Sequence, residues 1–233
     1  MNKKWQIFEP DKNKIEEIKN KYKVNQLLAT ILANRNILKE EDIRLFLNPT
    51  RNDFYNPFLI TDMDIAVNRI IKAIENKENI TIYGDYDVDG ITSITVLKSF
   101  LNDIGVETNT YIPNRLIEGY GLNKEAIDKI SKKGCNLMIT VDCGISAIEE
   151  IEYANSLGIE TIITDHHEVP FEEKDGTKEY IVPNADAVVN PKQADCEYPF
   201  KEICGATVAY KLITAIVNSM GREMSSTNYL LEY

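Results

Sequence analysis

Apolar residues in the first third of the chain recur with helical spacing. One stretch contains Ile15, Ile18 and Tyr22, and a second contains Leu27, Leu28, Ile31 and Leu32. An acidic first turn, Glu40–Asp42, precedes a third apolar run that ends at Asn48-Pro49, as expected for a short helix. The period of Asp62–Glu75 predicts a fourth helix, which leads into an apolar run at Ile80. We expect these helices to serve packing rather than catalysis.

From residue 80 onward, short β-branched runs alternate with helical patterns. Strands are predicted at 80–83, 106–112, 136–141, 160–164 and 187–190, and helices at 91–102, 124–132, 145–157 and 203–217. The polar segment 171–186, with its Gly and Pro, is predicted to be a loop. This alternation is typical of βαβ units and of an α/β fold with a largely parallel sheet. We therefore expect a helical N-terminal segment over residues 1–60 and an α/β domain over 61–233.

Polar side chains gather where three of the predicted strands end. Asp85, Asp87 and Asp89 follow the first strand, Asp142 follows the strand ending at Val141, and Asp165, His166 and His167 follow the strand ending at Thr164. In a parallel sheet the carboxyl ends of the strands share one edge, and ligands bind in the crevice outside it. The chain has two histidines, and both fall in this group. We therefore expect the five aspartates and the two histidines to converge.

The chemistry expected of such a group is metal binding. Crowded carboxylates raise one another's pKa, and a hard divalent cation removes that penalty. Mixed carboxylate and imidazole ligands suit Mn²⁺, and less strongly Mg²⁺ or Zn²⁺. The carboxylates suffice for two ions about 3.5–4 Å apart, an arrangement that activates water for phosphoryl displacement. Asp142 is the candidate bridge between them. Taken singly, the same residues also fit a solvated acidic turn, helix caps and ordinary surface or core histidines.

Composition narrows the class of protein. The net charge is −11 with a pI near 4.8, which argues against a bulk basic surface for nucleic acid but leaves room for a local basic track or a bound metal. The four cysteines form no Cys-x-x-Cys pair and favour reduced thiols and a cytoplasmic location. No apolar run approaches the roughly 18 residues of a membrane span, and the N-terminus lacks the apolar region of a secretory signal.

Several motifs resemble those of a known superfamily. Gly84–Gly90, Val141–Ser146 and Thr164–Glu168 look like motifs I, II and III of the DHH phosphoesterases. Ile112–Gly121, Asn190–Lys192, Cys204–Leu212 and the leader ending Phe46–Pro49 resemble, more narrowly, the RecJ family of bacterial single-stranded-DNA-specific exonucleases. The resemblance covers essentially the whole chain. It implies a Rossmann-like DHH domain with helices on both faces of the sheet. It also implies metal-dependent 5′-to-3′ hydrolysis of single-stranded DNA, releasing mononucleotides, in repair and recombination.

The resemblance also implies roles for individual residues. Asp87, Asp89 and His166 would ligate metal, and Asp85 would be a ligand or lie just behind one. Asp142 would bridge two ions. Asp165 would orient the histidines, and His167 would lie behind the ligands or contact the scissile phosphate. Arg115, Gly119 and Tyr120 lie after a predicted strand end and are candidates for contacting the DNA, although a solvated loop is an equally good interpretation of Arg115.

The chain departs from the family pattern near its end. Family members carry a fourth motif, an Asp that completes the metal site, beyond the point where this sequence stops at Tyr233. A second catalytic-core domain with a glycine-rich His motif and an OB-type DNA-binding domain also follow in the family. We therefore expect this chain to be an N-terminal piece of a longer protein. We expect it to fold, to bind metal weakly and to show little or no nuclease activity alone.

Four other interpretations fit parts of the pattern. A DHH phosphoesterase acting on small substrates (an inorganic pyrophosphatase, an oligoribonuclease or a cyclic-dinucleotide phosphodiesterase) usually has His-x-Asn-x-Asp-x-Asp at motif I, which is absent here. A haloacid-dehalogenase-like phosphatase needs its nucleophilic Asp directly at the strand end, where Asp85-Tyr86 intervenes. A flavodoxin-like response module would leave the two histidines without a role. A non-catalytic replication scaffold would not need the metal ligands of the first three motifs.

Overall fold

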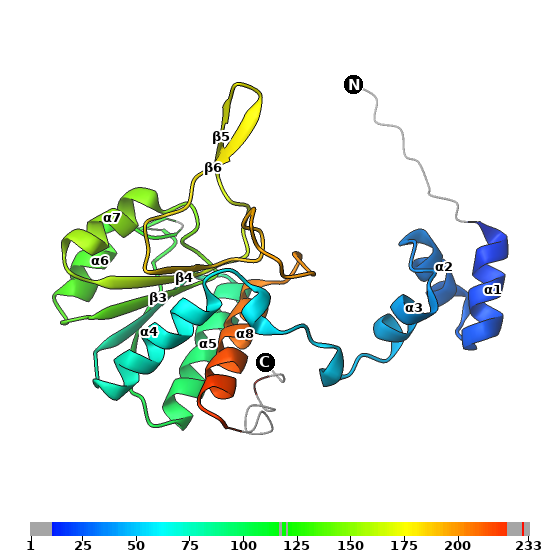
Figure 1. Cartoon of the computed structure of the whole chain (residues 1–233), viewed down its shortest axis with the longest axis horizontal. Coiled ribbons are helices and arrows are strands. Elements are labelled where there is room, and N and C mark those ends of the chain that lie inside the picture. The colour runs from blue at the N-terminus through cyan, green and yellow to red at the C-terminus, as the bar shows by residue number, and fades with distance from the viewer. Residues whose placement is uncertain (1–10, 117, 120, 223–229, 231–233) are drawn as a thin grey trace. The chain divides into compact units, whose positions relative to one another are not determined.

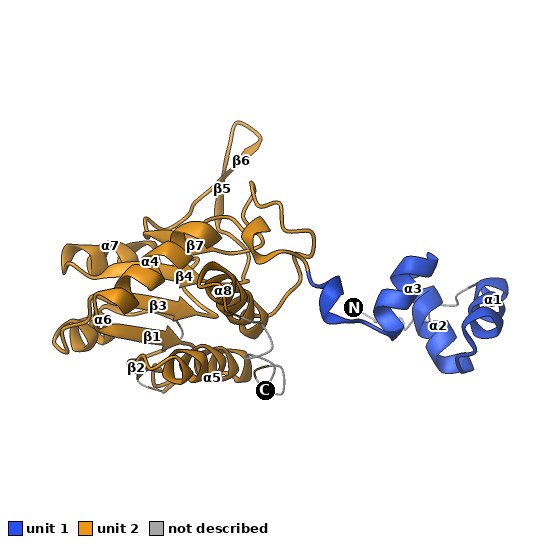
Figure 2. Ribbon diagram, turned by 60° about the horizontal axis from the view of Figure 1, so that its bottom comes forward, with its two compact units in different colours: residues 1–54 blue, residues 55–233 orange. Residues whose placement is uncertain are grey.

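The computed structural model describes residues 11–116, 118, 119, 121–222 and 230 (Figure 1). The chain forms two compact units, Met1–Phe54 and Tyr55–Tyr233 (Figure 2). The boundary lies earlier than the division after residue 60 that the sequence indicates. The reason is a 3₁₀ turn, Pro57–Leu59, which contacts helices α4 (Met63–Glu75) and α8 (Gly205–Ser219) of the second unit. No described helix is long and apolar enough to cross a membrane.

The first unit consists of short helices around a small apolar core. Its helices are α1 (Lys12–Tyr22), α2 (Gln26–Asn34) and α3 (Glu40–Leu47), and a 3₁₀ turn follows at Arg51–Asp53. Its core is formed by Ile15, Ile18, Ala29, Leu32 and Ile43. Asp11 and Asn25 cap α1 and α2 by accepting hydrogen bonds from the backbone N–H groups of Asn13 and Leu28. Such caps satisfy N–H groups that a short helix otherwise leaves unpaired.

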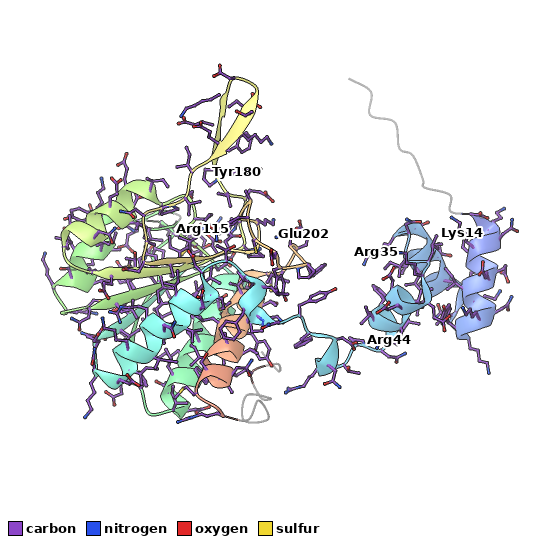
Figure 3. The ribbon with its side chains drawn as sticks, viewed as in Figure 1. Lys14, Arg35, Arg44, Arg115, Tyr180 and Glu202 are labelled. Atoms are coloured by element: carbon purple, nitrogen blue, oxygen red, sulfur yellow. The ribbon has the colours of Figure 1, made fainter. Side chains whose placement is uncertain are left out.

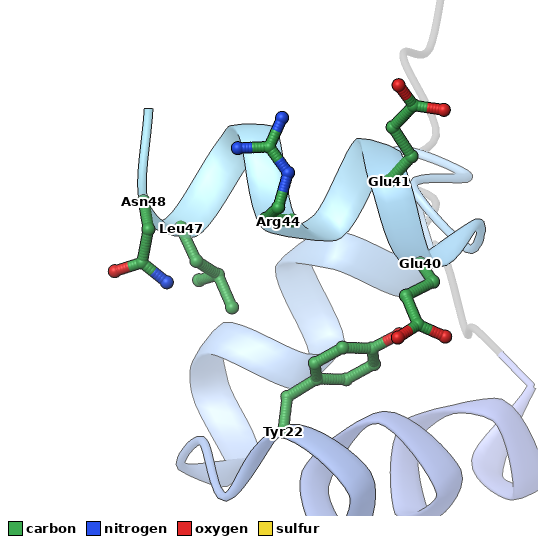
Figure 4. Close-up of a pocket in the computed structure, with 6 residues that line it drawn as sticks. All are labelled: Tyr22, Glu40, Glu41, Arg44, Leu47 and Asn48. Carbon is green, nitrogen blue, oxygen red and sulfur yellow. The ribbon is translucent and has the colours of Figure 1, made fainter. Parts of the chain in front are cut away.

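A pocket of the first unit lies between α1 and α3 (Figure 4). It is lined by Tyr22, Glu40, Glu41, Arg44, Leu47 and Asn48. None of these residues belongs to the group of aspartates and histidines that the sequence singles out. That group lies entirely in the second unit.

Among its described residues, the second unit is built on a parallel five-stranded sheet. The strands are β1 (Ile80–Gly84), β2 (Thr108–Tyr111), β3 (Leu137–Val141), β4 (Glu160–Thr164) and β7 (Ala187–Val189), in the order β2-β1-β3-β4-β7. Every neighbouring pair in this sheet is parallel. The chain passes from β1 to β2 on one side and then to β3 on the other. The reversal between β1 and β3 is the position at which α/β sheets bind ligands.

Helices cover both faces of the sheet (Figure 1). Helices α4, α5 (Val88–Asp103) and α8 pack on one face, and α6 (Lys124–Ser131) and α7 (Ile148–Ser156) pack on the other. The strands alternate accordingly. Ile82 and Ile139 point into the core beneath α4, α5 and α8, whereas Tyr83 and Met138 point to the core beneath α6 and α7. The predicted α/β architecture with a helical N-terminal segment is therefore confirmed.

The loop predicted at 171–186 is wrong in its first part. Residues Phe171–Lys174 (β5) and Thr177–Tyr180 (β6) form an antiparallel hairpin that projects from the sheet (Figure 1). Its turn is Asp175-Gly176, and both residues have positive φ, at 53° and 76°. Asp-Gly is a strong signal for a two-residue hairpin turn. All eight strand residues are exposed, so no apolar alternation accompanied that signal.

Candidate metal centre

The residues singled out by the sequence lie at the carboxyl edge of the parallel sheet. Asp85 to Asp89 follow β1, Asp142 follows β3, and the segment 165–167 follows β4. Strands β1, β3 and β4 are consecutive neighbours in the sheet. The structure therefore brings these residues to one place, on both sides of the switch point between β1 and β3.

Two of the aspartates are buried without the hydrogen bonds that a buried carboxylate needs. Asp85 and Asp142 are each 1% exposed. Among the described residues, no hydrogen-bond partner is present for either carboxylate oxygen of Asp85 or for Oδ1 of Asp142. Nε2 of His166 lies 3.1 Å from that Oδ1, and the two form an ion pair only when the imidazole is protonated. Unpartnered oxygens of this kind are costly in a folded protein unless a ligand satisfies them.

Burial is the largest cause of the raised pKa values of these two carboxyls. Burial, and then the nearby charge of Asp87, raise the pKa of Asp85 above its ordinary value. Burial, followed by the charges of Asp89 and Asp87, raises the pKa of Asp142 to about 8. Both shifts mean that the folded chain disfavours the ionised carboxylates. A bound cation would reverse that preference.

Local backbone geometry fixes the positions of Asp87 and Asp142. The side chain of Asp87 caps α5 by accepting a 2.9 Å hydrogen bond from the N–H of Gly90. A Cβ on Gly90 would lie 2.5 Å from the carbonyl oxygen of Asp85, so only glycine allows α5 to start this close to β1. Asp142 adopts a left-handed conformation, with φ of 58°, and its N–H donates to the carbonyl of Thr164 at 3.0 Å. The cap that Asp87 provides explains why α5 begins at Val88, whereas the apolar period predicted a start at Ile91.

Asp89 makes a contact that the sequence did not indicate. Its two oxygens accept hydrogen bonds from the backbone N–H groups of Gly205 and Ala206, at 2.7 and 2.8 Å. These groups form the start of α8, and the N-cap residue Cys204 makes no side-chain cap bond. Asp89 therefore caps a helix more than one hundred residues away. Its Oδ2 also lies 3.4 Å from Nε2 of His166.

The histidine pair is organised by Asp165. This carboxylate is 1% exposed and accepts hydrogen bonds from the backbone N–H groups of Ile145, His166 and His167. Its Oδ1 also lies 2.7 Å from Nδ1 of His167. Burial alone would raise the pKa of Asp165, but these hydrogen bonds outweigh it and hold the pKa below its ordinary value. The bond to Asp165 in turn raises the pKa of His167. When that imidazole is neutral with its proton on Nδ1, Nε2 is available as an acceptor or ligand.

Within the part of the chain that the structure describes, two sets of potential ligand atoms result. Asp142, His166 and His167 form one set, and Asp85, Asp87 and Asp142 form the other. Within each set, one ligand atom per residue lies within 4.8 Å of the others. Asp142 belongs to both. Carboxylate and imidazole donors with unpartnered buried oxygens fit a divalent cation such as Mn²⁺ or Mg²⁺. The cluster is therefore suited to a divalent metal ion.

Asn190 is a polar residue of this region to which the sequence assigned no role. It is fully buried after β7, and its side-chain amide donates to the carbonyl of His167 at 3.0 Å. Its Oδ1 accepts from the N–H of Lys192 at 2.8 Å. The only signal was the motif Asn190–Lys192 itself, because an Asn at a strand end is otherwise typical of a turn. Here Asn190 holds the backbone of the histidine segment.

The candidate DNA contacts Arg115 and Gly119 lie in the loop that follows β2. Arg115, labelled in Figure 3, is exposed. Its guanidinium carbon lies 5.3 Å from the centre of the Tyr86 ring. Its charge acts on Asp85 by partly opposing the rise in the pKa of that carboxyl. Gly119 has a φ of 80°, in the same loop. Tyr120 lies outside the described residues. Arg115 is therefore near the carboxylates, and its contact with DNA stays a prediction.

Comparison with known proteins identifies relatives of the chain. The single-stranded-DNA-specific exonuclease RecJ of Bacillus subtilis (strain 168) is 41% identical over 221 residues, which cover 95% of this chain and 27% of that protein. The RecJ of Escherichia coli (strain K12) is 35% identical over 158 residues, covering 67% of this chain and 26% of that protein. The chain thus spans about a quarter of the length of these curated relatives.

Solved structures show the same fold. A crystal structure of exonuclease RecJ bound to manganese is 30% identical, with a TM-score of 0.61, over 70% of this chain and 39% of that chain. RecJ from Thermus thermophilus in complex with Mn²⁺ is 24% identical, with a TM-score of 0.64, over 92% of this chain and 28% of that chain. The DHH family, N-terminal domain, matches residues 79–232, which include every aspartate and histidine of the candidate centre. The chain belongs to the DHH family.

Proposed function

We propose that this chain carries the metal-binding part of a nuclease that hydrolyses single-stranded DNA from its 5′ end and releases mononucleotides. The observation that carries the proposal is the pair of buried carboxylates, Asp85 and Asp142, which have unpartnered oxygens among the described residues. Asp142 lies beside His166 and shares a set of potential ligand atoms with Asp85. The names of the relatives support single-stranded DNA as the substrate class. The 5′-to-3′ direction and the place in repair and recombination are implied by the family resemblance, and the cytoplasmic location is inferred from the pattern of the four cysteines.

The proposed metal is Mn²⁺, with Mg²⁺ as an alternative, in a two-ion site. Asp142 would bridge the ions because it belongs to both sets of ligand atoms. Asp85 and Asp87 would complete one position and His166 the other, with Asp89 contributing from the start of α5. When bound, such ions lower the pKa of water and stabilise the charge of a reacting phosphate. They would also supply the positive charge that a chain of net charge −11 needs near DNA.

The remaining residues would handle the substrate. His167 is 44% exposed at the side chain, and Asp165 fixes its ring, so Nε2 can face a scissile phosphate. With its pKa raised by Asp165, the imidazole carries a proton over a wider pH range and can donate it to a phosphate oxygen. Arg115 would contact a second phosphate, and Gly119 and Tyr120 would border the DNA path. Hydrolysis would join the water oxygen to phosphorus and break a phosphorus–oxygen bond to the released nucleotide.

The test is Mn²⁺ titration by calorimetry on the chain and on Asp142→Asn and His166→Ala variants. The matched control is Asp175→Asn, because Asp175 is an exposed carboxylate that has a left-handed φ of 53°, close to that of Asp142. We expect binding to be lost or weakened at least tenfold in the two site variants and to be unchanged in the control. Binding that survives both site substitutions would place the metal elsewhere.

Hydrolysis is tested on single-stranded oligonucleotides labelled at the 5′ or the 3′ end, with Mn²⁺ present. Any activity should release the 5′ label first as a mononucleotide and should disappear in Asp142→Asn. Release of the 3′ label first, or equal activity on duplex DNA, would contradict the proposed substrate and direction.

A further inference from the structure

Helix α8 begins directly against the candidate metal centre. A Cβ built on Gly205 would lie 2.5 Å from Oδ1 of Asp142 and 2.7 Å from both its Cβ and its Cγ. Gly205 is the first residue of α8 and is not among the glycines with positive φ. The backbone conformation would therefore accept any residue. The obstacle to a side chain at position 205 is the carboxylate of Asp142.

Asp89 also contacts this end of α8. The N–H groups of Gly205 and Ala206 both donate to Asp89. The first turn of α8 thus contacts two aspartates from different elements: Asp89 of α5 through hydrogen bonds, and Asp142, which follows β3, through close packing. The distance between those two carboxylates depends on how closely α8 approaches.

We propose that Gly205 is a positioning residue that sets the place of Asp142 relative to Asp89 and so determines the affinity of the centre for its divalent cation. This inference rests on the proposed metal-binding function. Gly205 itself would contact neither metal nor substrate. Because it has no side chain, Gly205 leaves room for the carboxylate of Asp142.

Relaxation of the surroundings cannot restore that space cheaply. Rotation of the Asp142 side chain would move its oxygens, but its Cβ would still lie 2.7 Å from the added methyl group. Moving that Cβ means moving a backbone whose N–H bonds to Thr164 at 3.0 Å. Moving α8 instead would break its hydrogen bonds to Asp89. Either response changes the spacing of the carboxylates.

Helix propensity and contact with Asp142 predict opposite effects of Gly205→Ala on the stability of the chain. Alanine is normally better than glycine in a helix, so Gly205→Ala should stabilise the chain if only α8 were concerned. If contact with Asp142 dominates, the same substitution should destabilise it. Removing the Asp142 side chain should then restore the ordinary effect. Asp142→Gly provides that background, because glycine accepts the φ of 58° at position 142.

The first measurement is therefore a double-mutant cycle of thermal unfolding in EDTA. We expect Gly205→Ala to lower the melting temperature of the unchanged chain and to raise that of the Asp142→Gly variant by about 2 °C. An equal shift in both backgrounds would overturn the inference. If Gly205→Ala does not fold in the unchanged chain, recovery of folding in the Asp142→Gly background supports it, and failure in both overturns it. No metal is needed, so this result is independent of the proposed function.

The second measurement is Mn²⁺ titration of Gly205→Ala. We expect affinity to fall by about 10–100-fold, as it does when residues that orient metal ligands are changed. Ala215→Gly is the control, because it weakens α8 at a buried position far along the helix without adding an atom near Asp142. Equal affinity of the unchanged chain and Gly205→Ala would overturn the inference while leaving the metal site intact. Absence of binding in the unchanged chain would overturn the metal site, and with it the effect on affinity.

Discussion

Replacing Asp142 by asparagine should make the metal-free protein more stable. Asn has nearly the shape of Asp, tolerates the left-handed φ of 58° at this position, and carries no charge. The pKa of Asp142 is raised from 3.8 to about 8 by burial and by Asp89 and Asp87. At pH 7 the folded chain must therefore keep a proton that the unfolded chain releases. Retaining that proton is a cost of folding, and the substitution removes it.

The magnitude follows from the two pKa values. Between pH 3.8 and pH 7 the cost grows by about 1.36 kcal/mol for each pH unit, and it reaches about 4 kcal/mol at pH 7. The buried amide of asparagine returns about 1–3 kcal/mol of this gain if it finds no partner. A net gain of about 1–3 kcal/mol is left, which corresponds to a rise in melting temperature of roughly 3–10 °C for a chain of this size.

The pH dependence provides the sharper assay. A carboxyl whose folded pKa is raised makes the protein lose stability as pH increases from its ordinary pKa toward the folded one. The unchanged chain in EDTA should therefore lose stability between pH 4 and about pH 8 relative to Asp142→Asn. Urea unfolding at several pH values measures this, with Asp175→Asn as the matched control. A variant that is no more stable than the unchanged chain at pH 7.5, or two parallel pH profiles, would refute the reasoning.

Three further substitutions test other contacts of the second unit. Asp89→Ala removes the acceptor at the start of α8 and should cost about 1–2 kcal/mol in urea unfolding at pH 5; no loss would contradict its capping role. Asp165→Asn should lower the free energy of unfolding by about 2–3 kcal/mol at pH 7. Because the pKa of Asp165 is held low in the folded chain, this loss should shrink below pH 4, and a loss that does not vary with pH would contradict the prediction. Burial lowers the pKa of Lys211 to about 8, so Lys211→Met should stabilise the chain by about 1–2 kcal/mol at pH 7, although it removes the hydrogen bond to the Tyr55 carbonyl. This gain should fade as pH rises toward 10.5, where the lysine of the unfolded chain also loses its proton. A loss of stability at pH 7 would contradict the prediction for Lys211.

Much of the centre could be predicted from the sequence because strand ends are local features. Apolar runs mark β1, β3 and β4, and the polar residues that follow each run need no knowledge of distant contacts. Parallel pairing then places the ends of the strands at one edge. For the same reason the burial of Asp85 and Asp142 at that edge is a consequence of the fold. What periodicity could not provide is which oxygens lack partners.

The rest depends on contacts between segments that are far apart in the chain. Nothing near Asp89 signals that it caps α8, because its partners are backbone N–H groups that any sequence would supply. The space at Gly205 is likewise invisible until α8 is packed against Asp142. The hairpin at 171–180 was missed for a different reason. Its turn signal, Asp175-Gly176, was present, but exposed strands carry no apolar alternation that would support it.

Crowding of carboxylates at one sheet edge predicts a reversal in how pH affects stability. Without metal, stability should fall as pH rises toward 8, because the folded chain resists ionisation of Asp142 and Asp85. With Mn²⁺ the ionised forms are the ligands, so binding strengthens as protons leave and stability should rise over the same range. Melting temperatures from pH 5 to pH 8, with EDTA and with excess Mn²⁺, would show slopes of opposite sign, and Asp142→Asn should flatten both. Slopes of the same sign in the unchanged chain would mean that these carboxylates do not bind the cation, whatever the affinity measured at a single pH.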